Sequence, residues 1–142
     1  PESKIEPHFE EFVATCEFFG KKSAVGGLTA LFYYGLIEQV PHKVWMIVPP
    51  EQKTTMGKYR LIRTKITSRI GIDKIKGFRI TSIERTLIES LKHSTKIGVR
   101  TVIGAIRRAI REKKTNEVKI GQMATKLNMR STLVKYWETF VE

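Results

Sequence analysis

Apolar residues in the first third of the chain recur in patterns that predict two helices and a buried strand. Residues 8–19 carry an amphipathic stripe at i, i+3, i+4 and i+7, formed by Phe9, Phe12, Val13 and Cys16. A second stripe follows Gly26-Gly27 and ends near Gly35, a residue type that favours helix ends; its members are Leu28, Leu31, Phe32 and Leu36. After Pro41, the uninterrupted apolar run Val44–Val48 predicts a strand buried on both faces.

The middle of the chain predicts further strands. The first spans about Lys58 to Ile66, and its alternation of polar and apolar residues slips, which predicts a bulge near Ile62. Ile70–Ile75 and Gly77–Ile80 are shorter candidates joined by a turn near Lys76-Gly77. Together these segments predict a small sheet of three or four mostly antiparallel strands.

The second half of the chain has helical periodicity. Thr81 and Glu84 have the spacing of a capping box, and the helix that follows turns four apolar residues inward: Ile83, Leu87, Ile88 and Leu91. A helix over residues 95–111 buries Val99, Val102, Ile103, Ile106 and Ile110, and helices over 117–127 and 130–141 complete the chain. We therefore expect one α+β domain, residues 1–142, in which the sheet packs against five to six helices.

Charge adds a candidate binding surface. The chain carries 26 Lys and Arg against 14 Asp and Glu, a net charge of +12, which favours a polyanionic or acidic partner. One basic cluster lies between residues 53 and 79, where Asp73 is the only acidic residue: Lys53, Lys58, Arg60, Arg63, Lys65, Arg69, Lys74, Lys76 and Arg79. A second follows the polar side of the helix at 95–111: Arg100, Arg107, Arg108 and Arg111. The alternative is a solvated surface that only aids solubility.

The residues offer little for catalysis. His8, His42 and His93 are far apart in the sequence and form no spaced pair that a metal site would need. A glycine pair before a helix and strand is also a feature of nucleotidyltransferase-like domains, whose two-metal chemistry needs carboxylates near the strand. Lys43–Val48 contains none, and Asp73 is the chain's only aspartate. We expect no catalytic residue, no metal, no cofactor and no enzymatic activity, although a catalytically degenerate relative of that scaffold stays open.

The C-terminal segment offers a second alternative. Within residues 117–137, the small Ala124, the turn residue Asn128 and the apolar Val134 have the spacing of a helix-turn-helix, which predicts a stand-alone DNA-binding regulator. The competing interpretation is a pair of core helices that pack inward through Leu127, Leu133, Trp137 and Phe140.

Two motifs resemble the C-terminal domain of the AbiEi family, which comprises antitoxins and transcriptional regulators of type IV toxin–antitoxin systems. The first spans Gly26–Pro41 and the second Ile80–Leu91. The positions that carry the resemblance are Gly27, Leu28, Ala30, Leu31, Gly35, Leu36, Pro41, Glu84, Arg85 and Thr86. For Glu84 and Arg85, a buried ion pair and a contact site are both open.

The resemblance implies a bacterial protein of phage abortive infection that acts by binding. Its implied partners are DNA, through the basic surface, and a nucleotidyltransferase-like toxin. Family members usually carry an N-terminal winged helix-turn-helix, and residues 1–22 contain no such module.

No apolar run approaches the roughly 20 residues of a membrane span. Because the N-terminus is polar and cysteine is limited to Cys16, we expect a cytoplasmic location and no membrane partner.

Overall fold

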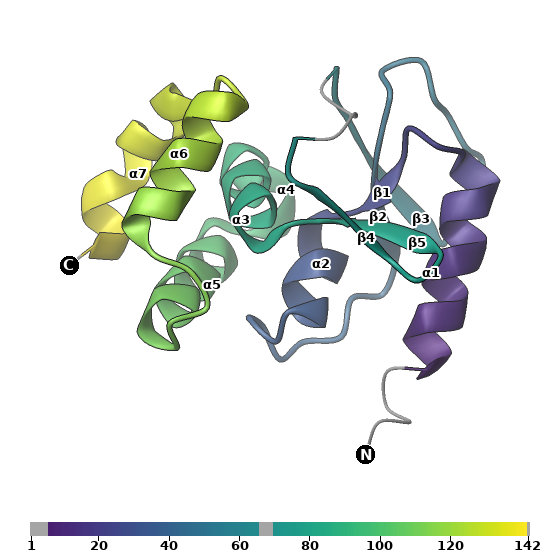
Figure 1. Cartoon of the computed structure of the whole chain (residues 1–142), viewed down its shortest axis with the longest axis horizontal. Helices are drawn as coiled ribbons and strands as arrows, with labels where there is room; N and C mark the ends of the chain where they lie inside the picture. Colours follow the sequence, from purple (N-terminus) through teal and green to yellow (C-terminus); the bar gives the residue numbers. More distant parts are fainter. Residues whose placement is uncertain (1–5, 66–69, 142) are drawn as a thin grey trace.

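The structure, a computed structural model, describes residues 6–65 and 70–141, and it is the predicted α+β domain. Its strands are β1 Ala24–Val25, β2 Val44–Val48, β3 Tyr59–Arg63, β4 Ile72–Ile75 and β5 Phe78–Thr81. Its helices are α1 Glu6–Phe19, α2 Gly27–Tyr33, α3 Ile83–Lys92, α4 Ser94–Ile97, α5 Val99–Arg111, α6 Glu117–Lys126 and α7 Arg130–Val141. The sheet and α1 occupy one end of the molecule, and α5, α6 and α7 occupy the other (Figure 1). No helix in these ranges is long and apolar enough to cross a membrane.

The sheet has five strands in the order β3-β2-β1-β5-β4 and is mixed, so the prediction of three or four mostly antiparallel strands is wrong in number and direction. The β1–β2 and β4–β5 pairs are antiparallel, whereas β1–β5 and β2–β3 are parallel. The strand that the pattern missed, β1, is only two residues long and too short to show a period. Its central position joins the parallel β2–β3 pair to the antiparallel β4–β5 pair in one sheet.

The predicted bulge near Ile62 is also wrong. Each residue of β3 pairs with one residue of β2, from Val44 opposite Tyr59 to Val48 opposite Arg63. Arg60 and Arg63 lie on opposite faces of this regular edge strand and are both exposed, so the slip in alternation involves no extra residue. By contrast, the predicted turn at Lys76-Gly77 is confirmed, because both residues have positive φ between β4 and β5.

The strand β2 is buried at all five residues, as its apolar run predicts. One face of the sheet packs against α1 through Phe12, Cys16 and Phe19, which confirms the predicted inner face of that helix. The opposite face contributes Trp45, Ile47 and Ile62 to a separate small cluster. The sheet is therefore covered on both sides.

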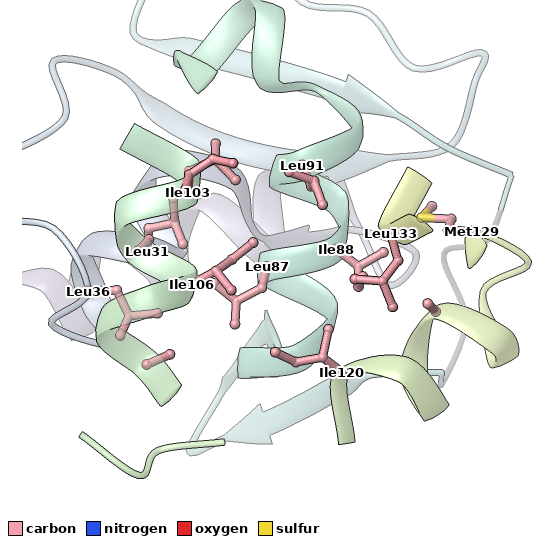
Figure 2. Packing of buried hydrophobic residues seen from close by; sticks show 14 of the residues in the cluster. Leu31, Leu36, Leu87, Ile88, Leu91, Ile103, Ile106, Ile120, Met129 and Leu133 are labelled. Carbon is pink, nitrogen blue, oxygen red and sulfur yellow. The ribbon is translucent and has the colours of Figure 1, made fainter. Parts of the chain in front are cut away.

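Helix α3 forms the centre of the helical half. Every residue from Arg85 to Leu91 is buried, and the helix contacts α2, α5, α6 and α7. In Figure 2, Leu87, Ile88 and Leu91 lie in the middle of the apolar cluster, with side chains from the surrounding helices converging on them. The predicted inward stripe is correct for these three, and its fourth member, Ile83, is half-buried against the same cluster, but burial of the helix on all sides was not predicted.

Two predicted helix boundaries need correction. The N-cap of α3 is Ser82 rather than Thr81, and its hydroxyl accepts a hydrogen bond from the Arg85 amide. The helix predicted over 95–111 is interrupted at Gly98, whose φ of 113° ends α4 and starts α5. Because α5 starts there, Val99 lies at its first turn and is 41% exposed instead of buried.

Candidate functional site: the basic face of helix α5

The most basic exposed helix in the described ranges is α5, whose position follows from its apolar side. Five residues are buried against the helical core: Val102, Ile103, Ala105, Ile106 and Ala109. The opposite side carries four exposed residues at i, i+4, i+7 and i+11, namely Arg100, Gly104, Arg107 and Arg111. We call these four residues the basic face of α5. No acidic residue occurs between Val99 and Arg111. Three of the four arginines predicted on this helix thus share one exposed face.

The fourth, Arg108, serves a structural role. Its Nε donates to Glu112 Oε2 at 3.0 Å, and its Nη1 lies 3.9 Å from Glu38 Oε2. The hydrogen bond from Arg108 lowers the pKa of the Glu112 carboxyl. Arg108 is therefore directed towards acidic partners of its own chain and away from the basic face.

An open groove runs along the basic face. Its volume is about 360 Å³, and it is lined by Val99, Arg100, Ile103, Gly104, Arg107 and Tyr136. Tyr136 comes from α7 and forms the wall opposite α5. Its hydrogen bond with Ser94, together with the nearby Lys135 ammonium, lowers the pKa of the Tyr136 hydroxyl. The groove thus combines apolar walls with an arginine at each end.

The other predicted basic cluster is divided by the sheet. Strands β3 and β4 form opposite edges, with three strands between them. At about 4.8 Å per strand, these edges are separated by roughly 19 Å. Exposed Lys53, Lys58, Arg60, Arg63 and Lys65 lie on or beside β3, whereas exposed Lys74 and Lys76 lie at β4. Residues 53–79 therefore do not form one continuous surface, and Arg69 lies outside the described residues.

Several of these cations have partners within the chain. Arg79 donates through Nε to the Ser23 carbonyl at 2.7 Å and through Nη2 to the Gly20 carbonyl at 2.8 Å, which holds the end of α1 against the sheet. Arg63 Nε donates to the Gln52 carbonyl at 2.9 Å. The Arg60 guanidinium lies 5.4 Å from the Trp45 ring centroid. Arg79 is thus a structural residue.

Arg85 is buried inside the protein. Its Nη2 donates to Glu89 Oε2 at 2.9 Å, its Nη1 donates to the Ile70 carbonyl at 2.6 Å, and both side chains are at most 1% exposed. The buried ion pair is therefore the correct alternative, although its acid is Glu89 rather than Glu84. Glu84 instead accepts a hydrogen bond from the Thr115 hydroxyl at 2.6 Å. Burial raises the pKa of the Glu89 carboxyl, and the Arg85 guanidinium acts in the opposite direction.

The remaining family-motif residues also build the fold. Gly27 has a φ of +52°, and a Cβ there would lie 2.8 Å from the Trp45 ring. Gly35 has a φ of +74° just after α2. Thr86 shares a 2.6 Å hydroxyl contact with Thr81. The apolar members lie in or against the core, namely Leu28, Ala30, Leu31 and Leu36, and Pro41 is half-buried.

The α6–α7 corner agrees only in part with a helix-turn-helix. Ala124 is fully buried, and Asn128 has a φ of 59° in the turn, as the motif requires. However, Val134 is 65% exposed, and Leu133 is the buried residue instead. Leu127 and Leu133 pack inward as the competing interpretation predicts, whereas the side chains of Trp137 and Phe140 are outside the described part.

The described ranges contain no group of three or more His, Cys, Asp or Glu side chains that could hold a metal ion. Cys16 is 1% exposed, and burial raises the pKa of its thiol. His93 is half-buried, and burial with nearby Lys96 and Lys92 lowers the pKa of its imidazole. His42 is exposed.

Sequence reasoning missed Gly104 and Tyr136 as parts of the groove. The available signal was a glycine inside a helix, placed between Arg100 and Arg107, which are seven positions apart. Tyr136 left no comparable signal, because its place opposite α5 depends on how α7 folds back.

The chain matches no protein-family model and no curated protein. The AbiEi resemblance therefore stays a prediction that rests on the motifs.

Proposed function

We propose that this protein is a non-enzymatic binding domain of the AbiEi antitoxin and autoregulator type, and that it binds DNA through the basic face of α5. The observation that carries the proposal is the alignment of Arg100, Arg107 and Arg111 on one exposed helix face that contains no acid. At 1.5 Å per residue, this alignment extends over roughly 16 Å of helix. The overall charge of +12 supports the same interpretation, since it attracts polyanions over a distance.

Arginine suits this role because its planar guanidinium donates to two phosphate oxygens at once and keeps its charge at any physiological pH. Contacts of this kind give affinity without reading the base sequence. We therefore expect this domain to contribute electrostatic affinity and orientation to an operator complex, with sequence recognition supplied elsewhere.

The experiment is a fluorescence-anisotropy titration of a labelled DNA duplex at increasing salt. Three phosphate contacts predict a slope of log affinity against log salt of about −2.7 from the α5 arginines alone. A slope near zero would contradict DNA binding. The control for net charge alone is a matched variant that loses three exposed lysines far from α5, at Lys22, Lys53 and Lys74.

Toxin neutralisation is the second part of the proposal, and it has a genetic test. A reading frame for a nucleotidyltransferase-like protein beside this gene, whose growth arrest the chain relieves on coexpression, would support it. Relief should occur without nucleotide transfer by this chain, because strand β2 carries no carboxylate. Failure to relieve growth arrest would remove the antitoxin assignment and leave a DNA-binding protein.

The partly matching α6–α7 corner favours one alternative, a stand-alone regulator that reads DNA with α7. The supporting observation is the left-handed Asn128 between two helices packed through Ala124 and Leu133. In that case Arg130→Ala and Lys135→Ala should abolish the preference for operator over unrelated DNA. If the basic face of α5 is the DNA-binding surface, the same changes leave that ratio unaltered.

A further inference from the structure

The groove on the basic face of α5 has a composition that duplex DNA does not match. Apart from Arg100 and Arg107, its lining consists of Val99, Ile103, Gly104 and Tyr136. Phosphate oxygens gain no favourable interaction from the apolar side chains of this lining, and they lose hydration against them. An occupant that covers this lining must present an apolar group.

Gly104 supplies the second observation. A Cβ at this position would meet no atom within 4 Å, and the residue has no positive φ, so neither packing nor backbone geometry requires glycine. Glycine inside a helix costs about 1 kcal/mol relative to alanine. The missing side chain deepens the groove at its midpoint and leaves the apolar lining open to an incoming group.

The flanking charges define the occupant further. Arg100 and Arg107 are separated by seven residues, which places them about 10 Å apart along the axis, one on each side of Gly104. An apolar side chain seated over Gly104, with carboxylates about one turn before and after it, would cover the apolar lining and bring an acidic group near the positive charge of each arginine. A second copy of this chain is disfavoured because each copy carries a net charge of +12.

We propose that the groove binds an acidic amphipathic helix of a protein partner, with an apolar side chain inserted over Gly104. This inference goes beyond the proposed function, because it assigns a protein partner to the same face of α5 and does not require that DNA binds there. Helix-in-groove recognition of this kind relies on a few apolar anchors for affinity and on charge complementarity for orientation.

The test is an NMR titration of the whole chain with a synthetic helical peptide. The peptide carries one leucine, with glutamates one turn before and one turn after it on the same face. We expect amide shifts at Val99, Ile103 and Gly104. A control peptide with lysines in place of the glutamates should leave these amides unmoved. No shifts, or equal shifts with both peptides, would overturn the proposal.

Two helix-interior glycines allow a matched pair of variants. Gly104→Gln fills the groove and should weaken peptide binding about tenfold or more, as expected for loss of an anchor pocket. Gly121→Gln makes the same change in α6, where a Cβ also meets nothing within 4 Å, and should leave peptide affinity unchanged. Equal effects of the two variants would overturn the proposal.

The DNA duplex separates this inference from the proposed function. Gly104→Gln retains every arginine, so its affinity for DNA should stay within about twofold of the parent chain. If the duplex binds and the peptide does not, the proposed function stands and the groove assignment is wrong. If the peptide binds and the duplex does not, DNA binding is wrong. Concentration-dependent self-association that moves the same amides would replace the partner with a second copy.

Discussion

Replacing Arg85 with methionine removes one member of the buried Arg85–Glu89 pair while keeping a long apolar side chain. The variant leaves the Glu89 carboxylate in a site that is 1% exposed and removes the donor to the Ile70 carbonyl. Breaking a buried pair in this way costs about 3–5 kcal/mol of unfolding free energy. For a domain of this size, that loss lowers the melting temperature by roughly 10–20 °C.

The pH dependence identifies the mechanism. Burial raises the pKa of Glu89 above its unfolded value of about 4.3, and loss of Arg85 raises this pKa further. A carboxyl with a raised native pKa stabilises the fold at pH below its unfolded pKa, and this contribution is lost as pH rises through the native pKa. The penalty of Arg85→Met should therefore be largest at neutral pH and shrink towards about pH 4.

Urea unfolding followed by circular dichroism at several pH values measures this penalty. The double variant Arg85→Met/Glu89→Leu removes both charges and should recover most of the lost stability, because a well-packed apolar pair often equals or exceeds a buried ion pair. A penalty below about 1 kcal/mol, or one that does not change with pH, would refute the assignment of Arg85 to the structural core.

Three further variants test other parts of the fold. Gly27→Ala should lose at least about 2 kcal/mol in urea unfolding, because its φ is +52° and its Cβ would lie 2.8 Å from the Trp45 ring; a neutral effect would contradict that geometry. Arg79→Ala removes charged donors from two backbone carbonyls and should cost about 1.5–3 kcal/mol, whereas Lys74→Ala, on the exposed edge strand, should stay within about 0.5 kcal/mol. Similar losses for both would contradict a structural role for Arg79. Because the pKa of His93 is lowered in the fold, its contribution to stability is present above its unfolded pKa of about 6.5 and is lost as pH falls through the native pKa. Thermal unfolding between about pH 7.5 and 5 measures this decline in stability. The variant His93→Gln should remove the part of the decline that His93 causes.

The sequence predicted the elements whose apolar pattern is local. The inner face of α1, the buried strand β2 and the turn at Lys76-Gly77 all follow from short-range spacing and are confirmed. The mixed sheet could not be predicted in this way, because the direction of β3 depends on how the loop at 49–58 returns the chain. The two-residue β1 has no period at all, and it still joins both halves of the sheet.

The candidate site was predictable only as a helix face. The spacing of Arg100, Arg107 and Arg111 fixes their common side. Arg108 was grouped with them although its partner Glu112 lies one turn further along the chain, and its contact with Glu38 depends on tertiary structure. The structure divides the cluster at 53–79 between the two edges of the sheet. The sequence could not predict this division, because the positions of charges do not indicate the order of strands in a sheet. For Arg85 the sequence left a buried ion pair and a contact site both open, since a charged side chain inside a fully buried helix leaves no local signal.

The central claim is that the basic face of α5 is the DNA-binding surface. Its most direct test compares two triple variants of equal charge in the anisotropy titration: Arg100→Ala/Arg107→Ala/Arg111→Ala, and Lys22→Ala/Lys53→Ala/Lys74→Ala on the sheet half. The first should reduce the salt slope by about 3 and weaken binding strongly with little change in melting temperature, whereas the second should leave the slope nearly unchanged. Equal loss in both variants would contradict the claim, because DNA would then respond only to net charge.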